Sequence, residues 1–205
     1  MFDHSSLLPV VAAMLHAAGF ILYNINTKKG DSKPNFVSWF IWALLSTMNA
    51  LTFTAATNWV NALVTFVGAT GCIGTFILTL FTGKFKRPDW KDIASLSACL
   101  LSIVLWKFLD PVIANAVLFP GLLLSFEPSA RGVLYNPLFE KKLLPWWLWT
   151  SAYVLTMVNT FLFQGGISFK LVMPLAMTLC HAIVPIICLH LRNKNTPVFE
   201  LPTMS

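Results

Sequence analysis

The sequence predicts an all-α polytopic membrane protein with seven transmembrane helices. Hydrophobic residues make up 57% of the chain and charged residues only 11%, whereas soluble domains carry about a quarter charged residues. The long apolar stretches are continuous rather than alternating, which favours helices over the strands of a membrane barrel. Because the bilayer core contains no water, the backbone of such a chain must satisfy its own hydrogen bonds, as helices do.

Seven stretches approach the roughly 20 apolar residues that a helix needs to cross a bilayer. The opening MFDHSS has no basic segment, so the first stretch is predicted to be a retained span rather than a cleaved signal peptide. The least regular boundary is the Asp110-Pro111 break, because the fifth stretch is short and contains Pro120. This stretch ends at Phe126 or continues by a turn or two. In chain order the predicted spans are Leu7–Ile25, Phe36–Thr57, Val60–Phe81, Ile93–Leu109, Val112–Phe126, Trp146–Phe163 and Leu171–Leu191.

The basic residues predict the orientation of the spans. Alternate loops lie on opposite sides of the membrane, and one side receives only Lys107 and Lys170. The other receives Lys28, Lys29, Lys33, Lys84, Lys86, Arg87, Lys91, Arg131, Lys141, Lys142, Arg192 and Lys194. The positive-inside rule then places the N-terminus outside and the C-terminus in the cytoplasm, with the chain in the plasma membrane. The net charge of +6 belongs to these loops, and no nucleic-acid partner is predicted.

Two tryptophan-rich stretches indicate an internal repeat. The stretches are KPNFVSWFIW at 33–42 and LPWWLW at 144–149. Each has lysines on its N-terminal side, a proline suited to a first helical turn and a pair of tryptophans. The second pair, Trp146 and Trp149, lies 107 positions after the first, Trp39 and Trp42. The chain thus divides into a first three-helix repeat (1–81), a cytoplasmic loop with a connector helix (82–111), a second three-helix repeat (112–191) and a cytoplasmic tail (192–205). The single connector makes the repeats parallel, about an axis normal to the membrane, so that a solute path can lie between them.

A dozen positions carry a resemblance to a known family. They are Lys33, Pro34, Asn35, Ser38, Trp39 and Trp42, the Gly83–Trp90 stretch, and Pro128, Pro137, Glu140, Pro145 and Trp146. With them the chain resembles the SWEET and PQ-loop superfamily of small-solute transporters, and most closely uncharacterised bacterial seven-helix members with a Lys-Pro-Asn-x-x-Ser-Trp-x-x-Trp stretch. The resemblance implies a 3+1+3 helix arrangement and alternating access.

The family's Pro-Gln hinge is only partly present. The second repeat has Pro128-Ser129, which is a proline without the glutamine, and the first repeat has Leu22-Tyr23-Asn24 at the corresponding place. A proline removes a backbone donor and loosens a helix. If the hinge idea applies, Pro128 is the hinge candidate and only the second repeat retains it.

Five side chains are predicted to line a solute pocket at mid-depth. His16 and His181 lie near the centres of their spans, where polar side chains avoid lipid. They would bind a polar solute or carry a proton, or else only hydrogen-bond a neighbouring helix. Ser46 and Asn49 follow the first tryptophan pair along one helical stripe, and Tyr153 follows the second pair.

The tryptophans themselves have two interpretations. Trp39, Trp42, Trp146 and Trp149 are candidates for gating, because aromatic faces stack on a sugar or a flat heterocycle. Their positions near the ends of spans favour the alternative, an aromatic belt at the membrane surface, which would also include Trp147.

Missing motifs narrow the function further. None of the eight acidic residues falls in a predicted span, and HExxH, GxSxG and Walker sequences are absent from the sequence. The four cysteines have no metal-type spacing. We therefore predict no enzyme activity, cofactor or metal, and a neutral or zwitterionic solute that is sugar-like or heterocyclic. The alternative is a non-transporting scaffold, sensor or assembly factor that binds a partner or anionic lipid through its basic loops. A homo-oligomer is compatible with either function.

Overall fold

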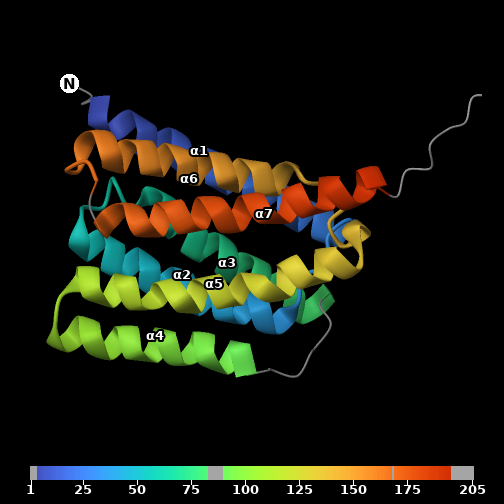
Figure 1. Ribbon diagram of the computed structural model, residues 1–205, viewed down its shortest axis with the longest axis horizontal. Coiled ribbons are helices and arrows are strands. Elements are labelled where there is room, and N and C mark those ends of the chain that lie inside the picture. The colour runs from blue at the N-terminus through green and yellow to red at the C-terminus, as the bar shows by residue number, and fades with distance from the viewer. Residues whose placement is uncertain (1–3, 83–89, 168, 195–205) are drawn as a thin grey trace, which may run out of the picture.

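The computed structural model describes residues 4–82, 90–167 and 169–194, and within these ranges it contains helices and no strand (Figure 1). This confirms the predicted all-α class. The seven α-helices are α1 (His4–Lys28), α2 (Phe36–Ala56), α3 (Leu63–Thr82), α4 (Trp90–Phe108), α5 (Pro111–Tyr135), α6 (Leu144–Phe163) and α7 (Val172–Lys194), with two short 3-10 helices, η1 (Pro137–Phe139) and η2 (Phe169–Leu171).

Two helices begin where the sequence supplies a capping side chain. The Asn35 carboxamide oxygen accepts the backbone N–H of Val37 at 2.9 Å, and α2 starts at the next residue. The Asp110 carboxylate accepts the backbone N–H of Val112 at 2.7 Å, with Pro111 in the first turn of α5. Each cap satisfies a backbone donor that has no partner inside the helix.

The fifth helix is longer than the predicted span. The prediction is Val112–Phe126 with a continuation of a turn or two, whereas α5 continues to Tyr135 with Pro120 and Pro128 inside it. A proline removes only one backbone donor, so the helix continues through both. Because α4 and α5 both extend beyond the predicted spans, Asp92 and Glu127 lie within helices rather than in loops.

Within the part of the chain that the structure describes, five helices are long and apolar enough to cross a membrane by length and composition. They are Leu7–Lys28, Phe36–Ala56, Leu63–Thr82, Pro111–Tyr135 and Val172–Lys194. The other two α-helices are not among these five: α4 carries Lys91, Asp92 and Lys107, and α6 contains three tryptophans and three threonines.

Apolar side chains cover the outside of the bundle while many polar ones lie inside it. Met14, Leu100 and Leu179 are 68%, 65% and 61% exposed, whereas His16 and Asn159 are 2% and 1% exposed. Water would disfavour such large exposed apolar surfaces. The chain therefore has the features of a helical membrane protein.

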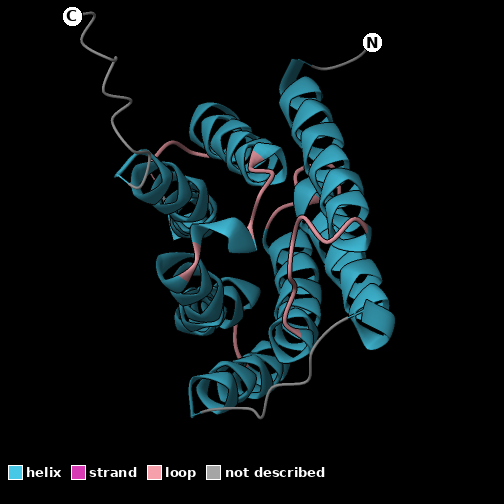
Figure 2. Ribbon diagram, turned by 90° about the vertical axis from the view of Figure 1, so that its right-hand side faces the viewer, coloured by secondary structure: helices cyan, strands magenta, loops and turns pink. Residues whose placement is uncertain are grey.

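The helices pair in a pattern that repeats. In the first half α3 contacts α1 and α2, and in the second half α7 contacts α5 and α6. Across the halves, α1 packs on α6 as α5 packs on α2. Exchanging α1, α2 and α3 with α5, α6 and α7 leaves this set of contacts unchanged. Helix α4 contacts α5 and α2 and lies at the edge of the bundle (Figures 1 and 2).

Three basic segments meet at one end of the bundle, which we call the basic end. It comprises the loop at 29–35, the loop at 136–143 and the last turn of α7 (Figure 1). The Lys141 backbone N–H donates to the Asp31 carbonyl at 2.8 Å, and the Lys141 ammonium lies 3.4 Å from the Asp31 carboxylate. The Arg192 guanidinium donates to the carbonyl of Pro137 at 2.9 Å and to the carbonyl of Glu140. These contacts connect the two loops and tie the second one to α7.

Candidate functional site

Two histidines from opposite halves of the chain meet around one tyrosine ring. His16 of α1 is 2% exposed and His181 of α7 is 8% exposed. The Tyr153 ring lies between them, with its centroid 5.1 Å from the His16 ring and 5.2 Å from the His181 ring. Three of the five predicted pocket residues are thus in contact at the middle of the bundle.

The backbone fixes the proton position in each neutral histidine ring. The His16 Nδ1 atom lies 2.9 Å from the Val64 carbonyl oxygen, and the His181 Nδ1 atom lies 2.7 Å from the Met177 carbonyl oxygen. A carbonyl only accepts, so we assign the proton to Nδ1 in both rings. In a neutral ring Nε2 is then left as a hydrogen-bond acceptor, and the histidines together offer two acceptors to a bound molecule.

A small cavity of about 30 Å³, which we call the central pocket, adjoins both histidines. This volume holds about one water molecule. Helix α3 approaches closely here because Gly68 lacks a side chain: a Cβ atom on it would lie 3.1 Å from His16 Cε1. The lining residues are His16, Phe20, Trp39, Trp42, Ser46, Gly68, Cys72, Leu122, Phe126, Trp149, Tyr153, Met177 and His181. The middle of the bundle is therefore aromatic and nearly closed in this conformation.

The other two predicted pocket residues have different positions. Ser46 lines the central pocket, and its hydroxyl lies 3.5 Å from the Cys72 sulfur. Asn49 does not line it. The Asn49 side-chain oxygen accepts from the Asn115 amide at 2.8 Å, and the same amide donates to Thr52 at 2.9 Å. Asn49 therefore joins α2 to α5, one turn away from the pocket.

Four tryptophans lie inside the bundle, so the aromatic-belt interpretation is wrong for them. Trp39, Trp42, Trp146 and Trp149 are between 1% and 5% exposed, whereas Trp147 is 37% exposed. A position near the end of a span gives depth in the membrane but not the direction in which the side chain points, and these four point inward.

The buried indoles also offer hydrogen-bond donors. Trp42 Nε1 donates to the Ser125 carbonyl at 3.0 Å. The indole N–H groups of Trp146 and Trp149 are buried and meet hydrogen-bond geometry with no described residue. Buried polar groups are rarely left in this state, and Trp149 lines the central pocket. A polar molecule entering that pocket would find a free indole donor beside the two histidine acceptors.

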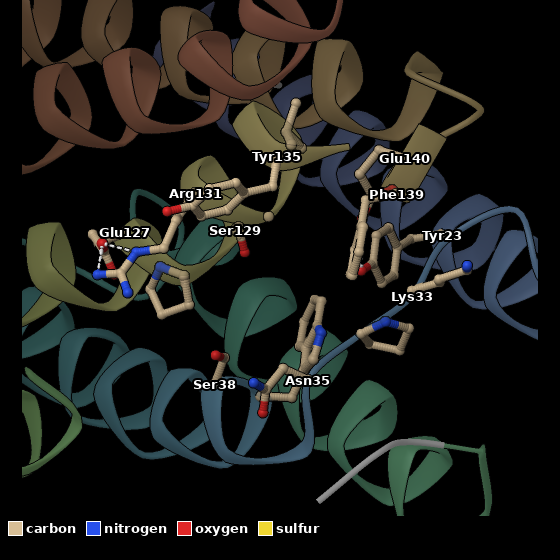
Figure 3. A pocket seen from close by; sticks show the side chains of 15 residues that line it. Tyr23, Lys33, Asn35, Ser38, Glu127, Ser129, Arg131, Tyr135, Phe139 and Glu140 are labelled. Carbon is tan, nitrogen blue, oxygen red and sulfur yellow. Dashed lines mark hydrogen bonds and ion pairs between the residues drawn. The ribbon is translucent and has the colours of Figure 1, made fainter. Parts of the chain in front are cut away.

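A larger cavity of about 200 Å³ opens at the basic end, and we call it the basic-end cavity (Figure 3). Its walls come from α1, the start of α2, the end of α5 and the two basic loops. The lining residues are Tyr23, Lys33, Pro34, Asn35, Ser38, Trp39, Glu127, Pro128, Ser129, Arg131, Gly132, Val133, Tyr135, Phe139 and Glu140. Trp39 lines both cavities, so the first tryptophan stretch forms the wall between them.

Glu140 is a buried carboxylate in this cavity. It is 6% exposed, and it accepts the Ser32 hydroxyl at 2.7 Å and the Tyr23 hydroxyl at 3.2 Å. Burial raises its pKa from the usual 4.5 to about 7; the two hydroxyls, the nearby Trp146 indole and the charge of Arg192 oppose this rise.

Glu140 is one of the positions of the family resemblance, but its sequence context does not mark it as a functional residue. The one available signal is its place 107 positions after Lys33, the offset that relates the tryptophan pairs. The repeats thus carry opposite charges at this point.

No family model, curated protein or solved structure matches the chain. The resemblance to the SWEET and PQ-loop superfamily remains a prediction. Among the residues that the structure describes, no three histidine, cysteine or acidic side chains are grouped to hold a metal ion.

Proposed function

We propose that the chain transports a small neutral or zwitterionic polar solute across a membrane by alternating access. The observation that carries this proposal is the pair of cavities separated by Trp39. One opens at the basic end, and the other lies among the histidines at the middle of the bundle. A solute that moves between them needs only a displacement of aromatic side chains and of the helices that carry them.

The helix pairing supports two moving halves. The pairings of α3 with α1 and α2, of α7 with α5 and α6, of α1 with α6 and of α2 with α5 are unchanged when the first three helices are exchanged with α5, α6 and α7, as expected for two parallel repeats related by an axis along the bundle. In our proposal the repeats are residues 1–81 and 112–191, all seven helices span the membrane, and the connector is α4. The basic end faces the cytoplasm, by the positive-inside rule.

The charge of the central pocket favours a neutral or zwitterionic solute. Its described lining contains histidine, serine and aromatic side chains but no aspartate, glutamate, lysine or arginine. An ion with net charge would lose its hydration there without gaining a counter-ion. In this proposal Trp39, Trp42, Trp146 and Trp149 form the aromatic gate around the pocket.

A proline provides the proposed hinge. Pro128 lies inside α5 and lines the basic-end cavity. Because a proline has no N–H, the helix has one hydrogen bond fewer at this point and bends there more easily. A bend at Pro128 would move the wall of the cavity that carries Arg131 and Tyr135.

Uptake into proteoliposomes tests this proposal. The probes are radiolabelled glucose, alanine and uracil, which represent a sugar, a zwitterion and a flat heterocycle. We expect saturable uptake of at least one probe, and at least a tenfold loss in His16→Ala and His181→Ala. Trp147→Ala is the control, because Trp147 lies on the outside of α6. No saturable uptake of any probe contradicts transport; uptake that persists in both histidine variants excludes only the histidines.

One observation favours the non-transporting alternative. Lys28, Lys29, Lys141 and Lys142 are exposed at the basic end, where they would attract an acidic partner or anionic lipid. A scaffold of this kind would bind vesicles rich in phosphatidylserine in a salt-dependent manner and would take up none of the three probes.

A further inference from the structure

We propose that the basic-end cavity binds a small zwitterion, with its ammonium group beside Glu140 and its carboxylate against the first turn of α2. This binding proposal names the solute class of the proposed transporter. It rests on the proposed transport only for what happens to the molecule after it has bound. The binding itself requires no transport.

The carboxylate pole lies at the start of α2. Asn35 and Ser38 line the cavity there, whereas the Lys33 ammonium lies on the other side, 5.7 Å from the centre of the Phe139 ring (Figure 3). Backbone N–H groups at a helix N-terminus favour an anion. Ser38 gives independent evidence: it is 5% exposed, faces the cavity, and its hydroxyl forms no hydrogen bond with any described residue. Since buried hydroxyls are normally paired, this donor is available to a ligand.

The ammonium pole lies on the opposite side of the cavity, at Glu140 (Figure 3). The Tyr23 and Ser32 hydroxyls occupy two acceptor positions of its carboxylate. An ionised carboxylate has about four such positions, so acceptor capacity remains. The rings of Tyr23, Trp39 and Phe139 also line the cavity, and aromatic faces attract an ammonium group.

The remaining charged groups near the cavity are already engaged. Glu127 forms ion pairs with Arg131 and with Lys91, the latter at 2.7 Å. Arg192 donates to backbone carbonyls of the loop before α6. Lys33 forms no ion pair with a described residue, and its ammonium lies 5.7 Å from the centre of the Phe139 ring. Glu140 is therefore the acidic group of the described lining that a ligand's ammonium can meet.

The net charge and the size of the cavity agree with a small zwitterion. Two basic and two acidic residues line it, so a ligand with one charge of each sign keeps the balance. Its volume of about 200 Å³ is below the roughly 300–1,000 Å³ of pockets for drug-sized ligands. The ligand class is therefore a short molecule with an amino group and a carboxylate.

Calorimetric titration of the detergent-solubilised full-length protein tests the site. The probes are glycine, β-alanine and 4-aminobutyrate. Each is compared with two analogues, the acid that lacks its amino group and the amine that lacks its carboxylate. We expect at least one zwitterion to bind at least tenfold more tightly than both of its single-charge analogues. If every zwitterion binds no better than its analogues, the proposal is wrong.

Variants then separate the two poles. Ser38→Ala should weaken the binding of the zwitterion and of the acid about tenfold and leave that of the amine unchanged. Glu140→Gln should weaken the binding of the zwitterion and of the amine and leave that of the acid unchanged. The controls Ser97→Ala and Asp31→Asn lie outside the cavity lining and should bind as the wild type does. Equal losses in the Ser38 and Ser97 variants would overturn the assignment.

The outcome is separable from that of the transport proposal. Saturable glucose uptake without zwitterion binding would overturn this site and leave transport standing. Zwitterion binding with the expected variant pattern, but without uptake of the bound probe, would establish the site and count against transport.

Discussion

Replacing Glu140 by glutamine tests the energetics of the buried carboxylate most directly. The side chain keeps its shape but cannot ionise. In the wild type, burial raises the pKa of Glu140 from 4.5 to about 7, so the folded protein binds this proton more tightly than the unfolded chain. Glu140 therefore favours the folded state fully below about pH 4.5, and this contribution is lost as the pH rises to about 7.

The size of the effect follows from the two pKa values. The difference, 7 minus 4.5, is about 2.5, which corresponds to about 3 kcal/mol of unfolding free energy. For a chain of this length that is a change of roughly 6–12 °C in melting temperature. The groups around the carboxylate are Tyr23 from α1, Ser32 from the first loop, Trp146 from α6 and Arg192 from α7.

Thermal unfolding in detergent between pH 4.5 and pH 8 measures this contribution. The wild type should lose stability across the range, and Glu140→Gln should remove most of that loss, so that the variant is the more stable protein at pH 8. Asp31→Asn should keep the wild-type slope, because Asp31 is only partly buried beside Lys141. Identical pH dependence in the wild type and in Glu140→Gln would refute the reasoning. A wild type that gains stability towards pH 8, with that gain absent in Glu140→Gln, would refute it as well.

Three further substitutions test the packing. Gly71→Ala should destabilise the protein by about 1–3 kcal/mol in thermal unfolding, because a Cβ atom there would overlap the Phe20 ring. The control is Gly74→Ala, which has nothing within 4 Å of its Cβ and should be neutral or stabilising by up to about 1 kcal/mol. Equal effects of the two substitutions would contradict this account. Asn115→Ala should cost about 1–3 kcal/mol, because it removes hydrogen bonds of 2.8 and 2.9 Å to two α2 side chains; an unchanged melting temperature would show that the pair is not stabilising. Arg192→Gln should speed amide hydrogen exchange in the loop before α6, whose carbonyls accept from the guanidinium, without an equal change in α3.

Helix positions could be predicted from sequence because apolar length and capping residues act locally. Asn35 and Asp110 cap the helices that follow them, and both positions are visible in the sequence as polar residues before an apolar run. The end of α5 could not be predicted in this way. The segment after Phe126 is more polar than a membrane span, yet α5 continues through it to Tyr135 with Pro120 and Pro128 inside the helix.

The candidate site could be predicted only in part. Depth in the membrane predicted interior positions for His16 and His181, and both are buried. A stripe on one helix does not reveal which helix faces it, so Asn49 was grouped with Ser46 although its partner is Asn115. Glu140 lies in a loop without periodicity, and its burial depends on a second loop more than a hundred residues earlier in the chain.

The pairing of the two loops at the basic end has a kinetic consequence. Ser32 and Glu140 form a backbone bridge as well as a side-chain hydrogen bond, and Lys141 bonds to Asp31 beside them. One loop joins the first two helices of the first half, and the other joins the first two helices of the second half. Any motion that parts the halves at this end must break these bonds together. These polar contacts lie outside the predicted spans and add to the barrier for that motion, so its rate is expected to change with the pH of the aqueous phase through Glu140.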